Sequence, residues 1–110
     1  MKGNIVLVPF PFTDLTASKI RPALVLYEGG DDTVLAFISS RILKGEIPKG
    51  SVLINESHPE FFRSGLKTTS VIRLDKVATV LSSLIIGELG IAGPNICNMV
   101  NNAIDNLYHL

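Results

Sequence analysis

Arg21 is the residue of this chain whose type and position are best suited to chemistry. It precedes Pro22 and the apolar run at 23–26, which is typical of a buried strand. Because proline lacks an amide hydrogen and holds the preceding residue extended, we expect Pro22 at the first residue or on the edge of a strand. Arg21 would then lie at the strand's entrance. A guanidinium fixed there is a good phosphate ligand, since its planar donors match phosphate oxygens.

Ser39 is the second candidate, because it ends an apolar run and precedes Ser40 and Arg41. The glycines at 29–30 predict a hairpin, and Arg21 and Ser39 each lie nine positions from a turn centred on the second of them. Antiparallel pairing would set them opposite, within a slip of one or two residues. Together they could bind and polarise a phosphodiester without a metal. A solvated arginine and turn-forming serines would explain the same residues, so both interpretations stay open.

Other standard chemistries are missing from the sequence, which has no Gly-rich phosphate loop, no GxSxG motif and no paired metal-ligand spacing. His58 and His109 lie far apart and are predicted to be surface residues. Cys97 falls near the apolar stripe of a predicted helix, which favours a buried, inert thiol. The pair at 31–32, Asp-Asp, is predicted to be a solvated turn. We therefore expect an enzyme without a metal or another cofactor.

Composition points to one globular domain covering residues 1–110, of which 46% are apolar. The formal net charge is zero, which argues against holding long nucleic acid by bulk charge but allows a local basic groove. A single cysteine excludes an internal disulfide and fits a reducing cytoplasm. We expect no membrane span and no secretory signal, because no apolar run approaches the roughly 20 residues that a span needs.

Hydrophobic periodicity predicts a chain of short strands followed by one helix. The predicted strands cover residues 5–8, 22–27, 33–40, 50–54, 68–81 and 85–86. The stretch 9–19 is an unusually long loop, and 56–63 could form a single helical turn. A helix is predicted from Pro94, with Gly93 as its cap. Its apolar residues recur at helical spacing: Ile96, Met99, Val100, Ala103, Ile104 and Leu107.

Four segments, in this order along the chain, resemble the MazF/PemK family of toxins. They are GNIVLVPFPFTDL at 3–15, RPALVL at 21–26 (preceded by Ser18 and Lys19), LAFISSR at 35–41 and SVIRLDKVATV at 70–80. The resemblance implies a mainly β (α+β) fold, a small SH3-like β-barrel with a C-terminal α-helix. It also implies the toxin of a type II toxin–antitoxin module, acting as a metal-independent endoribonuclease in the cytoplasm.

The resemblance also implies partners and a mechanism. Members of the family are homodimers that cleave single-stranded mRNA and are silenced by a cognate antitoxin laid across the RNA groove. The substrate's 2′-hydroxyl would attack its own phosphate and leave 2′,3′-cyclic phosphate and 5′-hydroxyl ends. Arg21 takes the place of the family's essential arginine, and Ser39 that of a hydroxyl residue that is usually threonine. Residues expected to contact RNA are Thr13, Lys19, Ser40 and Arg41.

Two other functions remain compatible with the sequence. The first is a toxin that binds its target without enzymatic activity, like the gyrase poisons that share the fold. Its function would sit in the C-terminal helix, and that group lacks the pairing of Arg21 with Ser39. The second is a degenerate member of the family that only binds a partner. Purified protein incubated with RNA in EDTA separates the enzyme from both.

Overall fold

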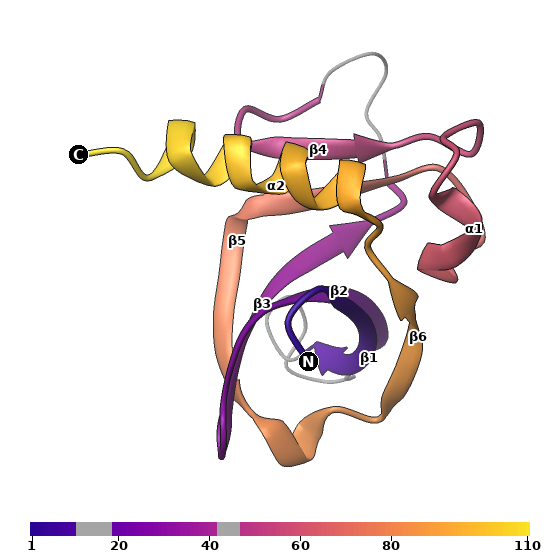
Figure 1. Ribbon diagram of the computed structural model, residues 1–110. Coiled ribbons are helices and arrows are strands. Elements are labelled where there is room, and N and C mark those ends of the chain that lie inside the picture. Colours follow the sequence, from indigo (N-terminus) through magenta and orange to yellow (C-terminus); the bar gives the residue numbers. More distant parts are fainter. Residues whose placement is uncertain (11–18, 42–46) are drawn as a thin grey trace.

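The computed structural model describes residues 1–10, 19–41 and 47–110 of the chain. Its elements are, in order, β1 (Asn4–Phe10), β2 (Lys19–Gly29), β3 (Asp32–Ser39), β4 (Ser51–Ile54), α1 (Phe61–Ser64), β5 (Ser70–Leu81), the 3₁₀ turn η1 (Ser82–Leu84), β6 (Gly87–Ile91) and α2 (Pro94–Leu107). The strands pair antiparallel in the order β4-β5-β3-β2-β1-β6. In Figure 1 this sheet curls into a half-barrel, and α2 lies across its β4–β5 end. The expected mainly β fold with a C-terminal helix is confirmed.

Both faces of the curled sheet are buried, each by its own hydrophobic cluster. The helix-side core comprises Ile5, Leu24, Ala36, Ile38, Val52, Ile54, Ile72, Leu74, Ala92, Ile96 and Val100. The barrel core comprises Val6, Val8, Ala23, Val25, Leu35 and Phe37. Neighbouring residues of one strand belong to different cores, as the two-residue period of a strand requires. The continuous apolar runs in the sequence therefore reflect strands with two buried faces.

Strand β5 takes part in both cores because it bends in the middle. Its register against β3 jumps between the pairs Ala36–Val77 and Phe37–Arg73, so that three residues of β5 have no counterpart on β3. Before the jump, Ile72 faces the helix-side core, and after it, Ala78 packs against the barrel core. Such irregularities bend a strand and increase its twist. This bend lets one strand cross from the helix-covered half of the sheet to the rolled half.

Pro22 does not begin its strand, because β2 begins at Lys19, but it does lie where one side of the strand is unpaired, which is the edge alternative of the expectation. Pro22 pairs with Leu7 of β1. The ladder from β2 to β3 extends only as far as the pair Ala23–Phe37, so the stretch of β2 before Ala23 pairs on one side. A proline fits there at a non-hydrogen-bonded position, because no amide donor is needed toward β3. Arg21 is therefore held inside a strand and not at its entrance.

The end of the sheet also differs from the sequence-based expectation. Ile85 and Ile86 were expected to form a strand, but they follow η1, and β6 begins only at Gly87. β6 pairs with β1 although two of its five residues are glycines. Local composition disfavours a strand there, and pairing with β1 overrides it. The predicted loop at 9–19 is shorter than expected at both ends, since Pro9 lies in β1 and Lys19 in β2, while 11–18 lie outside the described residues.

Helix α2 begins at the predicted proline, and its apolar stripe packs on the helix-side core as expected. The carboxylate of Glu60 caps its first turn: Oε2 accepts from the Asn95 amide at 3.0 Å and Oε1 from the Ile96 amide at 2.9 Å. Glu60 is only 7% exposed. A Cβ on Gly93 would lie 2.4 Å from Glu60 Cδ, so this approach requires glycine. At the other end of α2, the Tyr108 hydroxyl donates to the Leu74 carbonyl.

Replacing Glu60 with glutamine should lower the melting temperature and flatten its dependence on pH. Burial raises the pKa of Glu60, but the amides of Asn95 and Ile96, with His58 and Arg63 nearby, outweigh it and hold that pKa below its usual value. A carboxyl with a lowered folded-state pKa stabilises the fold above its unfolded pKa and loses this effect as the pH falls through the folded one. The gap in melting temperature between parent and Glu60→Gln should therefore narrow as the pH falls below the unfolded pKa of about 4.3.

Glu88→Gln is the matched control, because Glu88 is exposed on β6 and accepts no hydrogen bond from any other described residue. Thermal unfolding followed by circular dichroism across this pH range measures all three proteins. An equal loss of melting temperature in both variants would contradict a special role for the Glu60 cap.

Candidate active site

Arg21 lies half-buried on the barrel-core face of β2. It pairs with Val8 of β1, and it shares its face with Ala23, two residues further along the strand. Among the described residues, no hydrogen bond or ion pair holds its guanidinium. The backbone of Arg21 is thus fixed by the sheet, while its side chain keeps its donors for another group.

Ser39 is the last residue of β3, and it lies at the same end of the β2–β3 hairpin as Arg21, two residues beyond the last pair, Ala23–Phe37. The hairpin closes at the pair Gly29–Asp32, one residue away from the turn centre assumed from the sequence. The register then shifts by one between Val25 and Tyr27, so that Ala23 faces Phe37. These two offsets cancel. The ladder ends at Ala23–Phe37, and only a register continued for two more residues would align Arg21 with Ser39 on one face, so their alignment stays a prediction.

The hydroxyl of Ser39 is already oriented by the turn that follows it. Ser39 Oγ accepts a hydrogen bond from the Arg41 amide at 3.1 Å. Its own proton remains for donation, because a hydroxyl can accept and donate at once. The interpretation of Ser39 as a turn-forming serine is therefore confirmed, and its role in chemistry stays a prediction.

Three of the other four predicted RNA-binding residues lie near this end of β2 and β3. Lys19 is exposed and shares the face of β2 that carries Arg21, two residues away. Ser40 and Arg41 are exposed just after β3. Thr13 lies outside the described residues. Lys19, Arg21 and Ser39 thus lie at the same end of the β2–β3 hairpin, the end away from its turn.

A second arginine on this face was missed by the sequence analysis. Arg73 of β5 pairs with Phe37 of β3 on one side and with Ser51 of β4 on the other. Its Nε donates to Asp75 Oδ1 at 2.8 Å and its Nη2 to Asp75 Oδ2 at 2.6 Å. This hydrogen-bonded pair lowers the pKa of Asp75 and raises that of Arg73. An arginine inside the apolar run at 71–74, with an aspartate two residues later, was the available signal.

The residues set aside in the sequence behave as structural groups. His58 Nδ1 accepts from the Glu60 amide at 3.0 Å, and His109 is exposed near the C-terminus. Burial raises the pKa of the Cys97 thiol, with Glu60 adding to the effect, which disfavours the reactive thiolate. Within the described ranges, no group of three or more histidine, cysteine, aspartate or glutamate residues could hold a metal ion. Likewise, no helix among those residues is long and apolar enough to cross a membrane.

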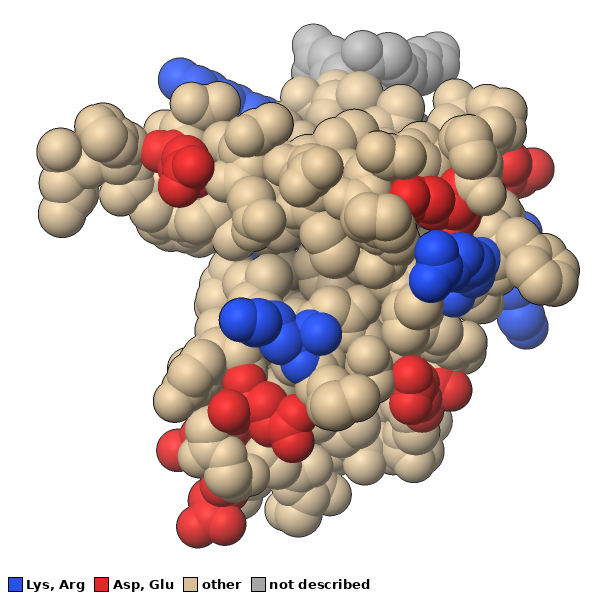
Figure 2. All heavy atoms as spheres, viewed as in Figure 1, with Lys and Arg blue, Asp and Glu red and all other residues tan. Residues whose placement is uncertain are grey.

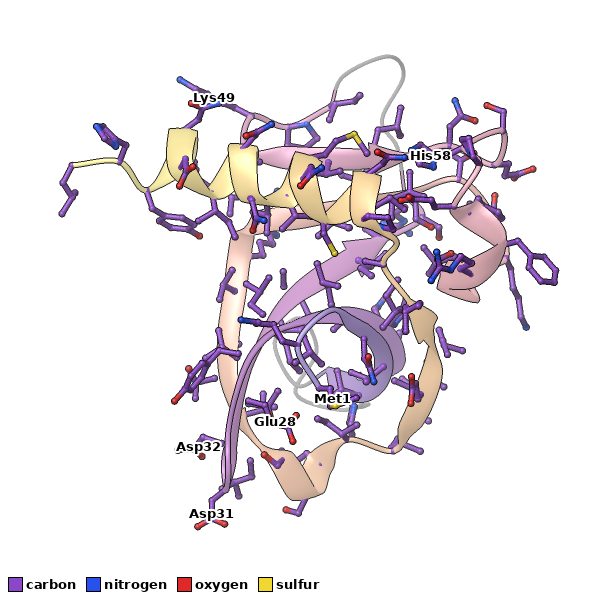
Figure 3. All side chains as sticks on the ribbon, viewed as in Figure 1. Met1, Glu28, Asp31, Asp32, Lys49 and His58 are labelled. Atoms are coloured by element: carbon purple, nitrogen blue, oxygen red, sulfur yellow. The ribbon has the colours of Figure 1, made fainter. Side chains whose placement is uncertain are left out.

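Charge is mixed over the face that α2 crosses. Figure 2 shows basic and acidic side chains interspersed there, with acidic ones gathered at the lower end of the view. Figure 3 places Asp31 and Asp32 at the tip of the β2–β3 hairpin, where they point outward as the turn chemistry predicted. Glu28, nearby, binds the N-terminal ammonium of Met1 at 2.9 Å. This face thus offers no continuous positive surface to a phosphate backbone.

Comparisons with known proteins find one family and a set of similar folds. Residues 1–108 match the sequence profile of the PemK-like, MazF-like toxins of type II toxin–antitoxin systems. The structure is similar to the Mycobacterium tuberculosis toxin MazF-mt6, with a TM-score of 0.74 at 18% identity over 97% of each chain. It is also similar to an endoribonuclease in complex with its cognate antitoxin, from Mycobacterial species, with a TM-score of 0.72 at 18% identity over 100% of this chain and 95% of that chain. Comparison with curated protein sequences finds no significant match.

Ser39→Ala should cost about 1 kcal/mol of unfolding free energy, because it removes the acceptor of the Arg41 amide at the end of β3. Ser40→Ala should cost less, since Ser40 is exposed and its hydroxyl bonds to no other described residue. Urea unfolding at neutral pH measures both values. Equal losses in the two variants would contradict the ordering role of Ser39.

Proposed function

Because the chain belongs to the PemK-like, MazF-like toxins of type II toxin–antitoxin systems, we propose that it cleaves single-stranded mRNA without a metal, with Arg21 and Ser39 as its catalytic residues. The observation that supports this proposal is that Arg21 and Ser39 lie at the same end of the β2–β3 hairpin, each two residues beyond the last pair, Ala23–Phe37. A fixed donor fork next to a hydroxyl suits a phosphodiester better than any other substrate group that the site could polarise.

In the proposed reaction, the 2′-oxygen of one ribose attacks the adjacent phosphorus, and the bond from phosphorus to the 5′-oxygen breaks. The 2′-hydroxyl loses its proton and the departing 5′-oxygen gains one. The products are a 2′,3′-cyclic phosphate and a 5′-hydroxyl end. Arg21 would stabilise the negative charge of the phosphorane through its N–H donors, or would protonate the leaving oxygen and be reprotonated from solvent. Ser39 would hydrogen-bond a phosphate oxygen with the proton that its turn leaves unused.

Residues around the same end of the β2–β3 hairpin would contact the RNA beyond the reacting phosphate. Lys19 continues the face of β2 that holds Arg21, and Arg41 and Ser40 are exposed beyond Ser39. Thr13, from the segment between β1 and β2, completes the proposed set. With a net charge of zero over the whole chain, binding must depend on these few local contacts and not on bulk attraction.

We further propose a cognate antitoxin as the protein partner, a homodimer as the working state and the cytoplasm as the compartment. One similar structure is an endoribonuclease bound to its cognate antitoxin, which supports the partner. Exposed apolar side chains on the sheet and on η1, among them Ile20, Tyr27, Leu81 and Leu84, are between 46% and 59% exposed and suit contact with another chain. The whole of 1–110 is proposed to act as one toxin domain.

Arg21→Ala should lower the rate of RNA cleavage about a hundred- to a thousandfold, because it removes a donor to charge that appears only in the transition state. Arg21→Lys should recover part of this rate, since an ammonium cannot donate two parallel hydrogen bonds. Cleavage of a fluorescent oligoribonucleotide in EDTA measures the effect, and one 2′-deoxy substitution at the cleaved position should block it.

Arg63→Ala is the matched control, because Arg63 is an exposed arginine on α1, away from β2 and β3. It should cleave at the parental rate. Parental cleavage by Arg21→Ala would overturn the assignment of the site. Growth inhibition by a parent protein that cleaves no RNA would instead favour a binding toxin.

Ser39→Thr should match or exceed the parental cleavage rate, because it keeps the hydroxyl and adds the methyl group usual in the family, whereas Ser39→Ala should impair cleavage. The two variants are compared with Ser40→Ala at matched melting temperature. Loss of cleavage in Ser40→Ala with retention in Ser39→Ala would place the catalytic hydroxyl one residue later.

A homodimer should give a light-scattering mass of about twice the 11.9 kDa of one chain at tens of micromolar protein. A second copy would cover the exposed apolar side chains of the sheet. A single-chain mass at that concentration would count against a groove built from two subunits, independently of the cleavage assay.

A further inference from the structure

We infer that the groove between α2 and the N-terminal residues binds a small aliphatic carboxylate, with its apolar tail in the groove and its carboxylate on Lys2. The groove shares no residue with the site proposed for RNA cleavage. The inference therefore goes beyond the proposed function and does not depend on it.

The groove is a gap at the margin of the helix-side core. A cavity of about 280 Å³ lies between β2, the N-terminal residues and one side of α2, and Figure 1 shows the N-terminus below that helix. Its apolar lining includes Leu24, Leu26, Val100 and Ile104. Leu24 and Val100 are buried, whereas Leu26 and Ile104 are only partly buried. The volume suits a ligand smaller than a drug-sized molecule.

One side of α2 adds polar groups to this apolar lining. Cys97, Asn101 and Ile104 follow one another at intervals of four and three residues, so they share one side of the helix. Asn101 is exposed, and its side-chain amide forms no hydrogen bond with any other described residue. A carboxylate only accepts hydrogen bonds, so this amide can donate to it.

Lys2 is held beside the groove by a tight turn. The Asn4 amide donates to the Met1 carbonyl at 3.0 Å, and Gly3 has a φ of +92°, which suits the third position of a type II turn. The Gly3 amide also donates to the Val25 carbonyl at 2.8 Å, which ties the turn to β2. The backbone of Lys2 is therefore fixed, while its side chain is exposed to solvent.

The charges around the groove favour an anion. Lys2 is the one charged residue among the described residues that line it, and in that part of the chain Lys2 forms no ion pair. Glu28, just beyond Leu26, is bound by the Met1 ammonium at 2.9 Å. An amine would thus meet an uncompensated ammonium, whereas a carboxylate would gain a charge-assisted hydrogen bond. A single ammonium also suits a singly charged head group.

The first test measures binding of hexanoate, octanoate and decanoate to the parent protein by isothermal titration calorimetry, below the concentrations at which they form micelles. Affinity should rise about fourfold for each methylene that enters the groove, and should level off once the groove is full. Octylamine should bind more weakly than octanoate. Equal affinity for these two, or no dependence on chain length, would overturn the inference.

Cys97 reports where the carboxylate binds. It is the one cysteine of the chain, it is partly exposed, and it lines the groove. Saturating decanoate should slow its alkylation by iodoacetamide several-fold, as measured by mass spectrometry. An unchanged rate would place the fatty acid elsewhere on the protein and would overturn the site.

Lys2→Gln should weaken octanoate binding several-fold and leave octanol binding unchanged, because it removes the head-group contact alone. Lys49→Gln is the matched control, since Lys49 is also exposed and lies above α2 in Figure 3. Equal losses in both variants would show attraction by net charge and would overturn the role of Lys2.

A groove-filling variant tests the apolar part of the site. Cys97→Leu should weaken decanoate more than hexanoate, because the added carbons take up room for the tail. Asn101→Leu, at an exposed position, tests the head group in case Cys97→Leu unfolds, and it should weaken all three carboxylates alike. Absence of binding by a parent protein that is dimeric in light scattering would indicate that a second copy covers the groove, and would overturn the inference.

Discussion

One constraint shapes the rest of the molecule: β5 must supply apolar side chains to two cores on opposite faces of one sheet. Ile72 and Leu74 serve the helix-side core, and Ala78 and Val80 pack against the barrel core. A straight strand with a strict two-residue period could not place both pairs correctly, because the side-chain faces would alternate without interruption. The three unmatched residues at the bend resolve this conflict, and they curl the sheet so that β2, β3 and β5 share the face that carries Arg21, Ser39 and Arg73.

Much of the fold could be predicted because its signals are local. The apolar stripe of α2, its proline start and the glycine hairpin between β2 and β3 each follow from residues close together in the sequence. The cap of α2 could not be predicted, since Glu60 lies about 35 residues before the amides that it binds. The prediction of the last strand failed for a similar reason: β6 contains two glycines, and only its pairing with β1 makes it a strand.

The candidate site was predictable to the extent that it depends on one hairpin. The placement of Arg21 and Ser39 at the same end of this hairpin follows from counting along two strands, although two one-residue offsets in the register happened to cancel. The position of Arg73 on this face could not be predicted, because it depends on the pairing of β3 with β5, two segments that lie far apart in the chain. In the sequence Arg73 is an isolated charge in an apolar run, and its pairing with Asp75 can be recognised only once the bend is known.

The Glu60 cap also sets the order in which a newly made chain can finish folding. Helix α2 is the last of the described elements, and it covers the helix-side core. The carboxylate that caps its first turn comes from Glu60, much earlier in the chain. Short helices are marginal on their own, so α2 has little structure before it docks. While its residues are still inside the ribosome, the half-barrel must remain open on that side. Until that docking, the helix-side core stays uncovered and the fold is incomplete.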